Sequence, residues 1–585
     1  MAVATAVLSP EQRARLHELL DGVYTADAAE DLTRRIAARL DGATARANTG
    51  PAWSAADVVL ITYADAISSE GEAPLRSLRT FLSTHLDGLI GQVHLLPFFP
   101  FTSDDGFAVS DYRRVDPQHG VWADVRALSE DVDLVFDLVI NHASSAHRLF
   151  QDFLENTSPG NQFFMTADPS VDVSGVTRPR ATRLLQEYET RDGPRHVWCT
   201  FSRDQVDWDF SNPEVLYEFV DVVVEYIEHG ASWLRVDAIA YLWKELGTSC
   251  VHLPQTHAIV KVLRLVAEAL DPNFKLLTET NVPLAENLSY FGDGDEANIV
   301  YNFSLPPLLL HALVTEDTRV LTEWCSSLPQ LPEGCTFLNF VASHDGIGLR
   351  PAEGLLDAEQ LDELIHCVEL FGGRLTQRAR PDGSLSPYEA NIALFDACQG
   401  TVEGEDAWQV ERFLASQGLM LSLAGVPALY YNSLIAAPND YAGLAETGRN
   451  RTINRTKWSS EHINARLSDP EGAPARVLTT LRAMLRVRQG QEAFHPEAGQ
   501  QCLSVDPRVF VVWRTSAKTG QRVLCIHNLS RSPITLSTAS LQLPAAAEAN
   551  ILFNSGDVSL EDETVSLAPY TVSWIEVQPD REGSP

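Results

Sequence analysis

The chain has 585 residues and a formal net charge of −35, with 44 Lys and Arg against 79 Asp and Glu. Its hydrophobic share of 45% and charged share of 21% are typical of a globular protein, and a chain this long can bury a large core without disulfide or metal staples. The acidity argues against nucleic acid or an anionic membrane surface as a partner, because both require a basic face.

The first fifty residues predict a helical N-terminal extension, residues 1–50. Ser9-Pro10-Glu11-Gln12 reads as a capping box with proline at the first helical position, so we expect a helix from about residue 10 to 20 that stops near Gly22. Residues 1–8 lack the basic region of a signal peptide, and no stretch of 18 apolar residues occurs. We therefore expect a cytoplasmic protein.

Eight short apolar runs follow, separated in most cases by amphipathic stretches such as 214–229 and 255–270. The runs are 57–64, 93–97, 133–140, 232–236, 275–278, 298–302, 336–341 and 426–431. Apolar strands that alternate with helices predict a parallel sheet buried on both faces. We predict the α/β class, a (β/α)₈ TIM barrel over 51–142 and 213–498. A doubly wound sheet is the alternative, but no GxGxxG follows an early strand.

Two intervals are too long for ordinary loops. Residues 143–212 predict a small inserted domain after the third strand, and residues 346–400 form a second long connection after the seventh. Both leave the carboxyl ends of barrel strands, so both should overhang the active face. From residue 499 short alternating strands appear, at 509–513, 522–526, 534–536, 551–553 and 571–577. They predict a separate all-β C-terminal domain, residues 499–585.

Several barrel strands end in acids or histidine, and one such residue alone is more often a helix cap or a turn former. Here three carboxylates, Asp237, Glu279 and Asp345, each follow an apolar run, which favours a polar cleft at the ends of the strands. Two carboxylates on facing strands are the minimum for retaining glycosidic chemistry, with the groups about 5–5.5 Å apart. Arg235, two residues before Asp237, can keep that side chain ionised as a nucleophile. Glu279 then needs a raised pKa to serve as the acid.

The segments DLVINH (137–142), LRVDAIAY (234–241), TETN (278–281) and ASHD (342–345) resemble, in order, the four short sequence regions of the α-amylase family of retaining α-glucosidic enzymes. The resemblance covers roughly residues 55–580. It implies that Asp237 is the nucleophile, Glu279 the acid/base and Asp345 the stabiliser of the transition state. Arg235, His142 and His344 would line the glucose subsite.

The sequence also resembles one subgroup of that family, the sucrose phosphorylases. These enzymes transfer glucose between an acceptor and inorganic phosphate with retention of configuration. The segments concerned are LITYAD (60–65), HLLPFFPFTSDDGF (94–107), RPR (178–180), DAIAYLWKELGTSC (237–250), SHDGIG (343–348) and GRNRTINR (448–455). The resemblance implies that Asp104, Phe107, Tyr241 and Arg451 contact the glucose. It implies that Arg180 contacts the phosphate or the acceptor; the alternative is that Arg178 and Arg180 pair with surface acids.

The acceptor is the open question. In SPYEAN (386–391), Tyr388 matches an aromatic of the acceptor loop, whereas Glu389 stands where sucrose phosphorylases have Gln. A carboxylate there suits a neutral polyol, because it can accept two hydroxyl donors, and this favours glucosylglycerol over glucosylglycerate, sucrose or sucrose 6′-phosphate as substrate. An anionic acceptor would need nearby cations, for which Arg350 and Arg374 are candidates.

The expected partners are therefore a small α-glucoside and inorganic phosphate, with no cofactor and no metal. A homodimer is one candidate assembly, and the sequence does not fix the oligomeric state. The alternatives are sucrose phosphorylase proper, an α-glucosidase or transglucosidase of the same fold, and a catalytically silent binding subunit. The silent subunit is disfavoured because both carboxylates are present.

Overall fold

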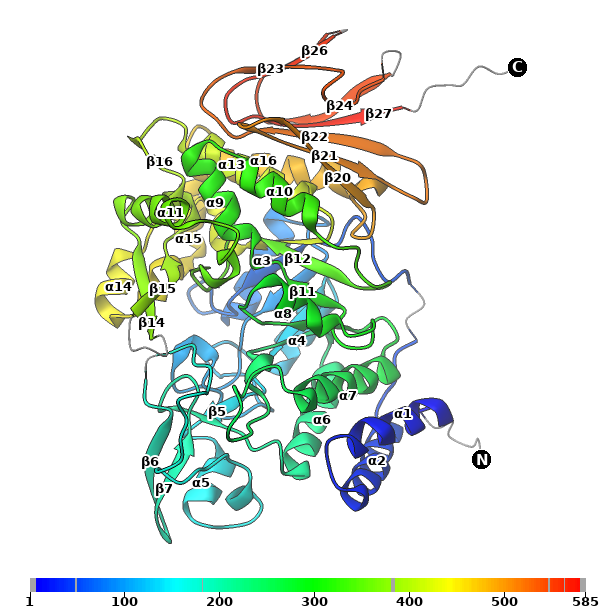
Figure 1. The fold of residues 1–585 in the computed structure, drawn as a ribbon, viewed down its shortest axis with the longest axis vertical. Helices are drawn as coiled ribbons and strands as arrows, with labels where there is room; N and C mark the ends of the chain where they lie inside the picture. The colour runs from blue at the N-terminus through cyan, green and yellow to red at the C-terminus, as the bar shows by residue number, and fades with distance from the viewer. Residues whose placement is uncertain are drawn as a thin grey trace.

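In a computed structural model of the chain, which describes residues 7–47, 50–180, 182–379, 385–544, 548–561 and 563–578, a closed barrel of eight parallel strands lies at the centre (Figure 1). Its strands, in chain order, are β1 (Val59–Thr62), β3 (Gln92–Leu95), β4 (Asp133–Leu138), β9 (Ala231–Val236), β10 (Lys275–Thr278), β11 (Ile299–Tyr301), β12 (Thr336–Phe340) and β18 (Val426–Tyr430). Each of the eight expected apolar runs overlaps one of these strands, which confirms the predicted barrel.

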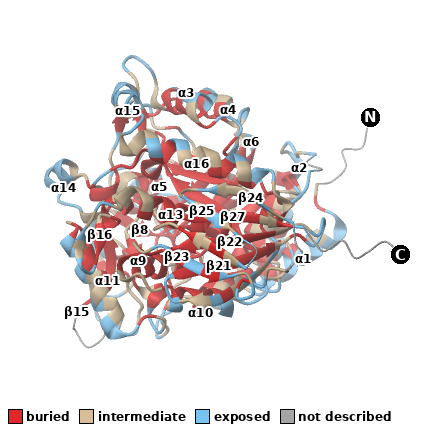
Figure 2. Cartoon of the chain, turned by 90° about the horizontal axis from the view of Figure 1, so that it is seen from above, coloured by how far each residue is buried: buried red, intermediate tan, exposed pale blue. Residues whose placement is uncertain are grey.

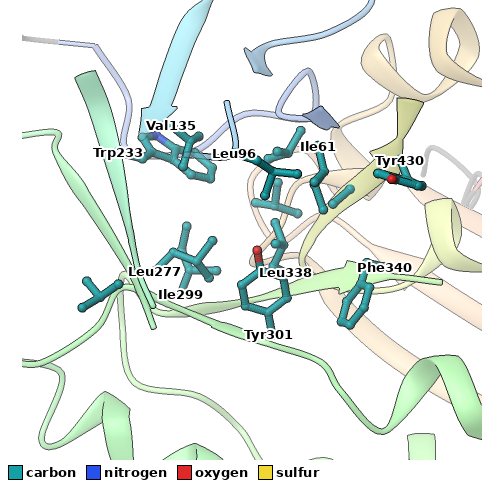
Figure 3. Close-up of a cluster of buried hydrophobic side chains, with 14 of the residues drawn as sticks. Ile61, Leu96, Val135, Trp233, Leu277, Ile299, Tyr301, Leu338, Phe340 and Tyr430 are labelled. Carbon is teal, nitrogen blue, oxygen red and sulfur yellow. The ribbon is translucent and has the colours of Figure 1, made fainter. Parts of the chain in front are cut away.

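The barrel strands are apolar because they are buried on both faces, as a parallel sheet covered by helices must be. Apolar side chains from β1, β4, β10 and β12, namely Ile61, Val135, Leu277 and Leu338, belong to the buried cluster of Figure 3, and each is at most 1% exposed. The larger surrounding helices are α3 (Pro74–His85), α4 (Trp122–Ser129), α6 (Pro213–Glu228), α7 (Pro254–Leu270), α9 (Leu305–Thr315), α10 (Arg319–Ser327), α11 (Ala358–Leu370), α13 (Gln409–Ser422) and α16 (Ala473–Gln489). Buried residues fill this centre and exposed ones gather at the periphery (Figure 2).

No helix in the described ranges is both long and apolar enough to cross a membrane.

The N-terminal extension is a helical hairpin, α1 (Pro10–Asp21) and α2 (Ala26–Asp41), as predicted for its first helix. Ser9 and Gln12 form the expected capping box, and Gly22 ends α1. The hairpin packs on α6 and α7 outside the barrel (Figure 1). Leu16, Leu20 and Ile36 are fully buried in this contact, which joins the hairpin to the core of the barrel.

Both long connections form structure of their own. After β4 the chain makes β5 (His142–Ser144), α5 (Arg148–Leu154), the hairpin β6 (Leu185–Thr190) and β7 (Gly193–Trp198), and β8 (Gln205–Asp207), which pairs with β5. After β12 it makes a three-stranded sheet in the order β13 (Ile347–Gly348), β15 (Leu385–Asn391), β14 (Arg374–Ala379).

Two antiparallel sheets follow the barrel and lie at the far end of the molecule from the β6–β7 hairpin (Figure 1). Their strands are β20 (Gly499–Asp506), β21 (Val509–Thr515), β22 (Arg522–Asn528), β23 (Ile534–Ser537), β24 (Ala549–Asn554), β25 (Val558–Leu560), β26 (Thr564–Leu567) and β27 (Val572–Val577). Residues such as Val511, Trp513 and Ile526 form a hydrophobic cluster separate from that of the barrel. We propose on this basis that the chain divides as its sequence predicts, at residues 51, 143, 213 and 499.

Candidate active site

The nucleophile candidate and the acid candidate follow two neighbouring strands that end at the same level. β9 and β10 pair in parallel with Val236 opposite Thr278, so Asp237 and Glu279 both emerge from the carboxyl end of the barrel. The backbone at Ala238 turns into the left-handed region (φ 49°), which is uncommon for a residue with a side chain. This turn directs the Ala238 N–H to the Glu279 carboxylate, at 3.0 Å from Oε2.

Arg235 is the buried cation that organises these acids. It is 2% exposed, and its Nη1 donates to Asp137 Oδ1 at 2.6 Å and to Asp237 Oδ1 at 2.5 Å. Asp137 is in turn held by His94, whose Nε2 lies 2.7 Å from Asp137 Oδ2. Glu279 is further away, with Oε2 at 3.9 Å from Arg235 Nη2.

The two catalytic candidates are therefore electrostatically unequal. Burial raises the pKa of Asp237 and of Glu279 to about 7 each, whereas Arg235 lowers both. Because Arg235 bonds Asp237 directly and Glu279 only at longer range, the negative charge is favoured on Asp237 and the proton on Glu279. This is the division of roles that retaining glycosyl transfer needs, with one ionised nucleophile and one protonated acid.

Asp345 remains a carboxylate. Burial alone would raise its pKa, but the guanidinium groups of Arg451 and Arg455 hold the pKa well below its usual range. Arg451 Nη1 lies 2.5 Å from Asp345 Oδ1. His344 stacks on the Phe107 ring with centroids 5.2 Å apart, and burial keeps this histidine neutral by lowering its pKa to about 3.

One cavity collects almost all of the expected site residues. Its lining includes Asp104, Phe107, His142, Arg180, Arg235, Asp237, Tyr241, Glu279, His344, Asp345, Tyr388 and Arg451. Arg180 comes from the connection after β4 and Tyr388 from the connection after β12, so both long connections overhang the barrel as predicted. In the described ranges the Arg180 guanidinium has no ion pair or hydrogen bond, so it is free to bind an anion.

Glu389 corrects the sequence-based expectation, because it does not line this cavity. It is fully buried, and its oxygens are occupied by Arg451 and by the Gly346 N–H. Arg350 and Arg374, the candidate cations for an anionic acceptor, also lie outside the cavity lining. Arg374 is exposed and donates to the Gly373 carbonyl at 3.0 Å, while Arg350 is near Tyr241 but not part of the wall.

Sequence reasoning missed some of the cavity wall. Phe201 and Gln205 line it, and Gln205 Nε2 donates to Asp104 Oδ2 at 3.1 Å and lies 3.1 Å from His142 Nε2. Both residues come from the end of the inserted segment and reach the site because β8 pairs with β5. No motif in the sequence marks this pairing. Thr280, Asn281 and Val282, directly after Glu279, complete the wall on the side of the acid.

A second and wider cavity of about 460 Å³ shares a wall with the first. Arg180 and Arg451 belong to both, and Arg449 and Arg455 line only the wider one. Arg455 is paired with Asp105 at 2.5 Å, whereas Arg449 is half exposed and 3.6 Å from the same carboxylate. A chain of net charge −35 thus gathers arginines at the entrance to its site.

Lys244 fills the polar space behind the site. Its ammonium lies 2.8 Å from Asn141 Oδ1 and 2.9 Å from Asp207 Oδ2, and the side chains of Lys244 and Asp207 are 3% and 0% exposed. Across the described ranges no group of three or more His, Cys, Asp or Glu side chains is placed to hold a metal ion. The lysine therefore supplies the positive charge that neutralises Asp207.

We expect Lys244→Met to destabilise the protein by about 3–5 kcal/mol, because it leaves the Asp207 carboxylate buried without a counter-charge. Urea unfolding followed by circular dichroism measures this loss. The matched control is Lys518→Met, whose partner Glu492 is 3.6 Å away and whose side chain is 78% exposed, and which should change stability by less than about 1 kcal/mol. Equal effects of the two substitutions would contradict the role of Lys244.

Comparison with known proteins identifies relatives along nearly the whole chain. Residues 88–345 match the model of the alpha amylase catalytic domain. A glucosylglycerate phosphorylase of Spirochaeta thermophila is 42% identical, covering 96% of this chain and 98% of the relative, and two further proteins of that name are 41% and 38% identical over similar shares. A glucosylglycerol phosphorylase of Marinobacter adhaerens is 28% identical and covers 75% of this chain and 88% of the relative.

Among solved structures, the sucrose 6F-phosphate phosphorylase from Thermoanaerobacter thermosaccharolyticum matches with a TM-score of 0.70 at 24% identity, covering 81% of this chain and 93% of that one. The likeness shows that the two proteins share a fold.

Proposed function

This chain belongs to the alpha-amylase family and to its sucrose-phosphorylase-like subgroup, and we propose that it is a retaining phosphorylase of an α-glucoside of glycerate. It would convert glucosylglycerate and inorganic phosphate reversibly into α-D-glucose 1-phosphate and glycerate. The coarser class, a glucoside phosphorylase of the glycosyltransferase type, follows from relatives of that class at 38–42% identity over almost the full chain.

The reaction proceeds in two displacements at C1 of the glucosyl group. Asp237 attacks C1, the bond from C1 to the glycerate oxygen breaks, and Glu279 gives its proton to that oxygen. A phosphate oxygen then attacks C1 of the glucosyl–enzyme, Asp237 leaves, and the phosphate proton returns to Glu279. Two inversions retain the α configuration. Arg235 and the Arg451–Asp345 pair stabilise the charges that develop in between.

The observation that carries the proposal is the Arg180 guanidinium, which has no partner among the described residues and lines the same cavity as the Asp237–Glu279 pair. Phosphate binding needs a cation or an amide-lined pocket, and a hydrolase, which uses water, does not. Arg449, which is half exposed, lines the wider cavity with Arg180 and adds to the local positive charge. Phosphate and the carboxylate of glycerate can use this cation in turn, because one leaves before the other enters.

The sequence favoured glycerol as acceptor, and two findings shift the proposal to glycerate. Glu389, the reason for a neutral polyol, lies outside the cavity with its oxygens occupied. Arg180, for which the described part of the chain provides no carboxylate partner, suits an anionic acceptor. The relatives support the same choice, because three that are named for glucosylglycerate align along 96–97% of this chain, whereas a relative named for glucosylglycerol aligns along 75%.

We expect glucose 1-phosphate with glycerate to release phosphate at least about 10-fold faster than with glycerol, because one charge-assisted hydrogen bond to the acceptor is worth about 1.5–3 kcal/mol. The assay compares glycerate, glycerol, fructose and fructose 6-phosphate at equal concentration. In the reverse direction, glucose 1-phosphate should form from glucosylglycerate only when phosphate is present. A preference for fructose or glycerol would contradict the acceptor, and free glucose formed at the same rate without phosphate would indicate a hydrolase.

A further inference from the structure

Glu389 lies directly behind the wall of the active site. It belongs to β15, where it pairs with Gly348 of β13 and Thr376 of β14. Side chains alternate between the two faces of a strand, so Tyr388 faces the cavity while Glu389 faces away from it. The Glu389 side chain is nevertheless 1% exposed or less, in a place where a carboxylate must have partners.

Those partners are a cavity-lining arginine and one backbone amide. Arg451 Nε donates to Glu389 Oε2 at 3.1 Å, and Arg451 Nη2 lies 3.0 Å from Oε1. This two-point pairing fixes the plane of the guanidinium as well as its position. The remaining Nη1 lies 2.5 Å from Asp345 Oδ1, as an ion pair. Arg451 therefore bridges a buried carboxylate behind the wall and the carboxylate expected to stabilise the transition state.

The backbone next to Asp345 is shaped for the same contact. The Gly346 N–H donates to Glu389 Oε1 at 2.8 Å. A Cβ on Gly346 would come within 2.6 Å of Glu389 Cγ and 2.7 Å of the Ala390 carbonyl, so only glycine allows this approach. Glu389 thus holds the segment after Asp345 from one side and the guanidinium that faces Asp345 from the other.

We propose that Glu389 is a positioning residue for glucosyl transfer, which fixes Arg451 and Gly346 so that Asp345 is held at the glucosyl group. It neither contacts nor selects the acceptor. The inference rests on the proposed function for the acceptors used in its test, but its first readout does not depend on them. That readout is the release of fluoride from α-glucosyl fluoride, which reports formation of the glucosyl–enzyme whatever the acceptor is.

The test uses Glu389→Gln, which preserves the shape, and Glu389→Ala, which leaves a space beside Arg451. We expect kcat/KM for α-glucosyl fluoride to fall about 10-fold in the glutamine variant and about 100-fold in the alanine variant, since a misplaced group costs that much in rate. Sodium formate should raise kcat/KM of the alanine variant by at least about 10-fold, because formate can occupy the space beside the guanidinium. A residue that only supports the fold would show no such rescue.

The matched control is Glu353→Ala. Glu353 Oε1 pairs at 2.5 Å with Nη2 of Arg378, a residue of β14 in the same three-stranded sheet, and neither residue lines the cavity, so activity should be unchanged and insensitive to formate. The second readout is the preference for glycerate over glycerol, which should stay within about two-fold of the wild-type ratio in both Glu389 variants.

Two results would overturn the proposal. One is wild-type fluoride release in Glu389→Gln; the other is an acceptor ratio changed by about 10-fold or more with fluoride release intact, which would make Glu389 an acceptor-selecting residue. If Glu389→Ala does not fold, the isosteric glutamine variant decides alone. If the wild-type enzyme releases fluoride but uses neither acceptor, the acceptor assignment is wrong and the fluoride readout still tests Glu389.

Discussion

Asp237→Asn is expected to lower phosphorolysis of the glucoside by on the order of 10⁴-fold or more, because an amide does not form the glucosyl ester through which both displacements pass. Asparagine has the same shape and keeps an oxygen that accepts from Arg235 Nη1, now 2.5 Å from Asp237 Oδ1. The fold should therefore persist, and loss of rate should not reflect unfolding. The measurement is the formation of glucose 1-phosphate at saturating phosphate, with thermal unfolding recorded in parallel.

Asp133→Asn provides a matched control for that experiment. Asp133 begins β4 at the opposite end of the barrel, where it is exposed and accepts a hydrogen bond from Ser232 at 3.1 Å. Its substitution removes one carboxylate from a barrel strand without touching the cavity, so turnover should stay within about two-fold of wild type. Turnover near the wild-type level in Asp237→Asn would show that another group attacks C1.

The barrel was predictable because each strand is a run of apolar residues long enough to stand out. The strands of the C-terminal domain were harder to predict. β20 was missed because five of its eight residues are polar or glycine and only Leu503 is buried. β25 and β26 were missed because only two of their seven residues are buried, so their sequences contain no continuous apolar run. Short, half-exposed strands are stabilised mainly by cross-strand neighbours, and those neighbours are distant in sequence.

The residues of the active site likewise include some that could be predicted from the sequence and some that could not. Asp237, Glu279 and Asp345 could be predicted because charged residues that end apolar strands need a polar cleft. Gln205 could not, since it reaches the cavity only through the antiparallel pairing of β5 with β8, across sixty residues of inserted chain. Glu389 was recognised as unusual but assigned the wrong neighbours. Its direction depends on which face of β15 meets the cavity, and alternation along a strand does not say which of two adjacent residues faces inward.

Glu279→Gln is expected to lower phosphorolysis of the glucoside by about 10³-fold, because the departing glycerate oxygen would leave as an alkoxide without a proton donor. The glutamine oxygen can still accept from the Ala238 N–H, at 3.0 Å from Glu279 Oε2, so the local turn should be kept. Fluoride is a weak base and needs no proton to leave. Release of fluoride from α-glucosyl fluoride should therefore fall far less, by about 10-fold or less.

The pH dependence separates the same roles. Burial raises the pKa of Glu279 to about 7, so the protonated acid is present below that pH and is lost as the pH rises through it. Wild-type kcat/KM for the glucoside should accordingly fall on the alkaline side of about pH 7. Glutamine does not titrate, and the alkaline decline should disappear from the residual activity of Glu279→Gln. If the decline persisted in the variant, or if both substrates lost rate equally, Glu279 would not be the proton donor, and the acid would have to be sought among the other groups that line the cavity.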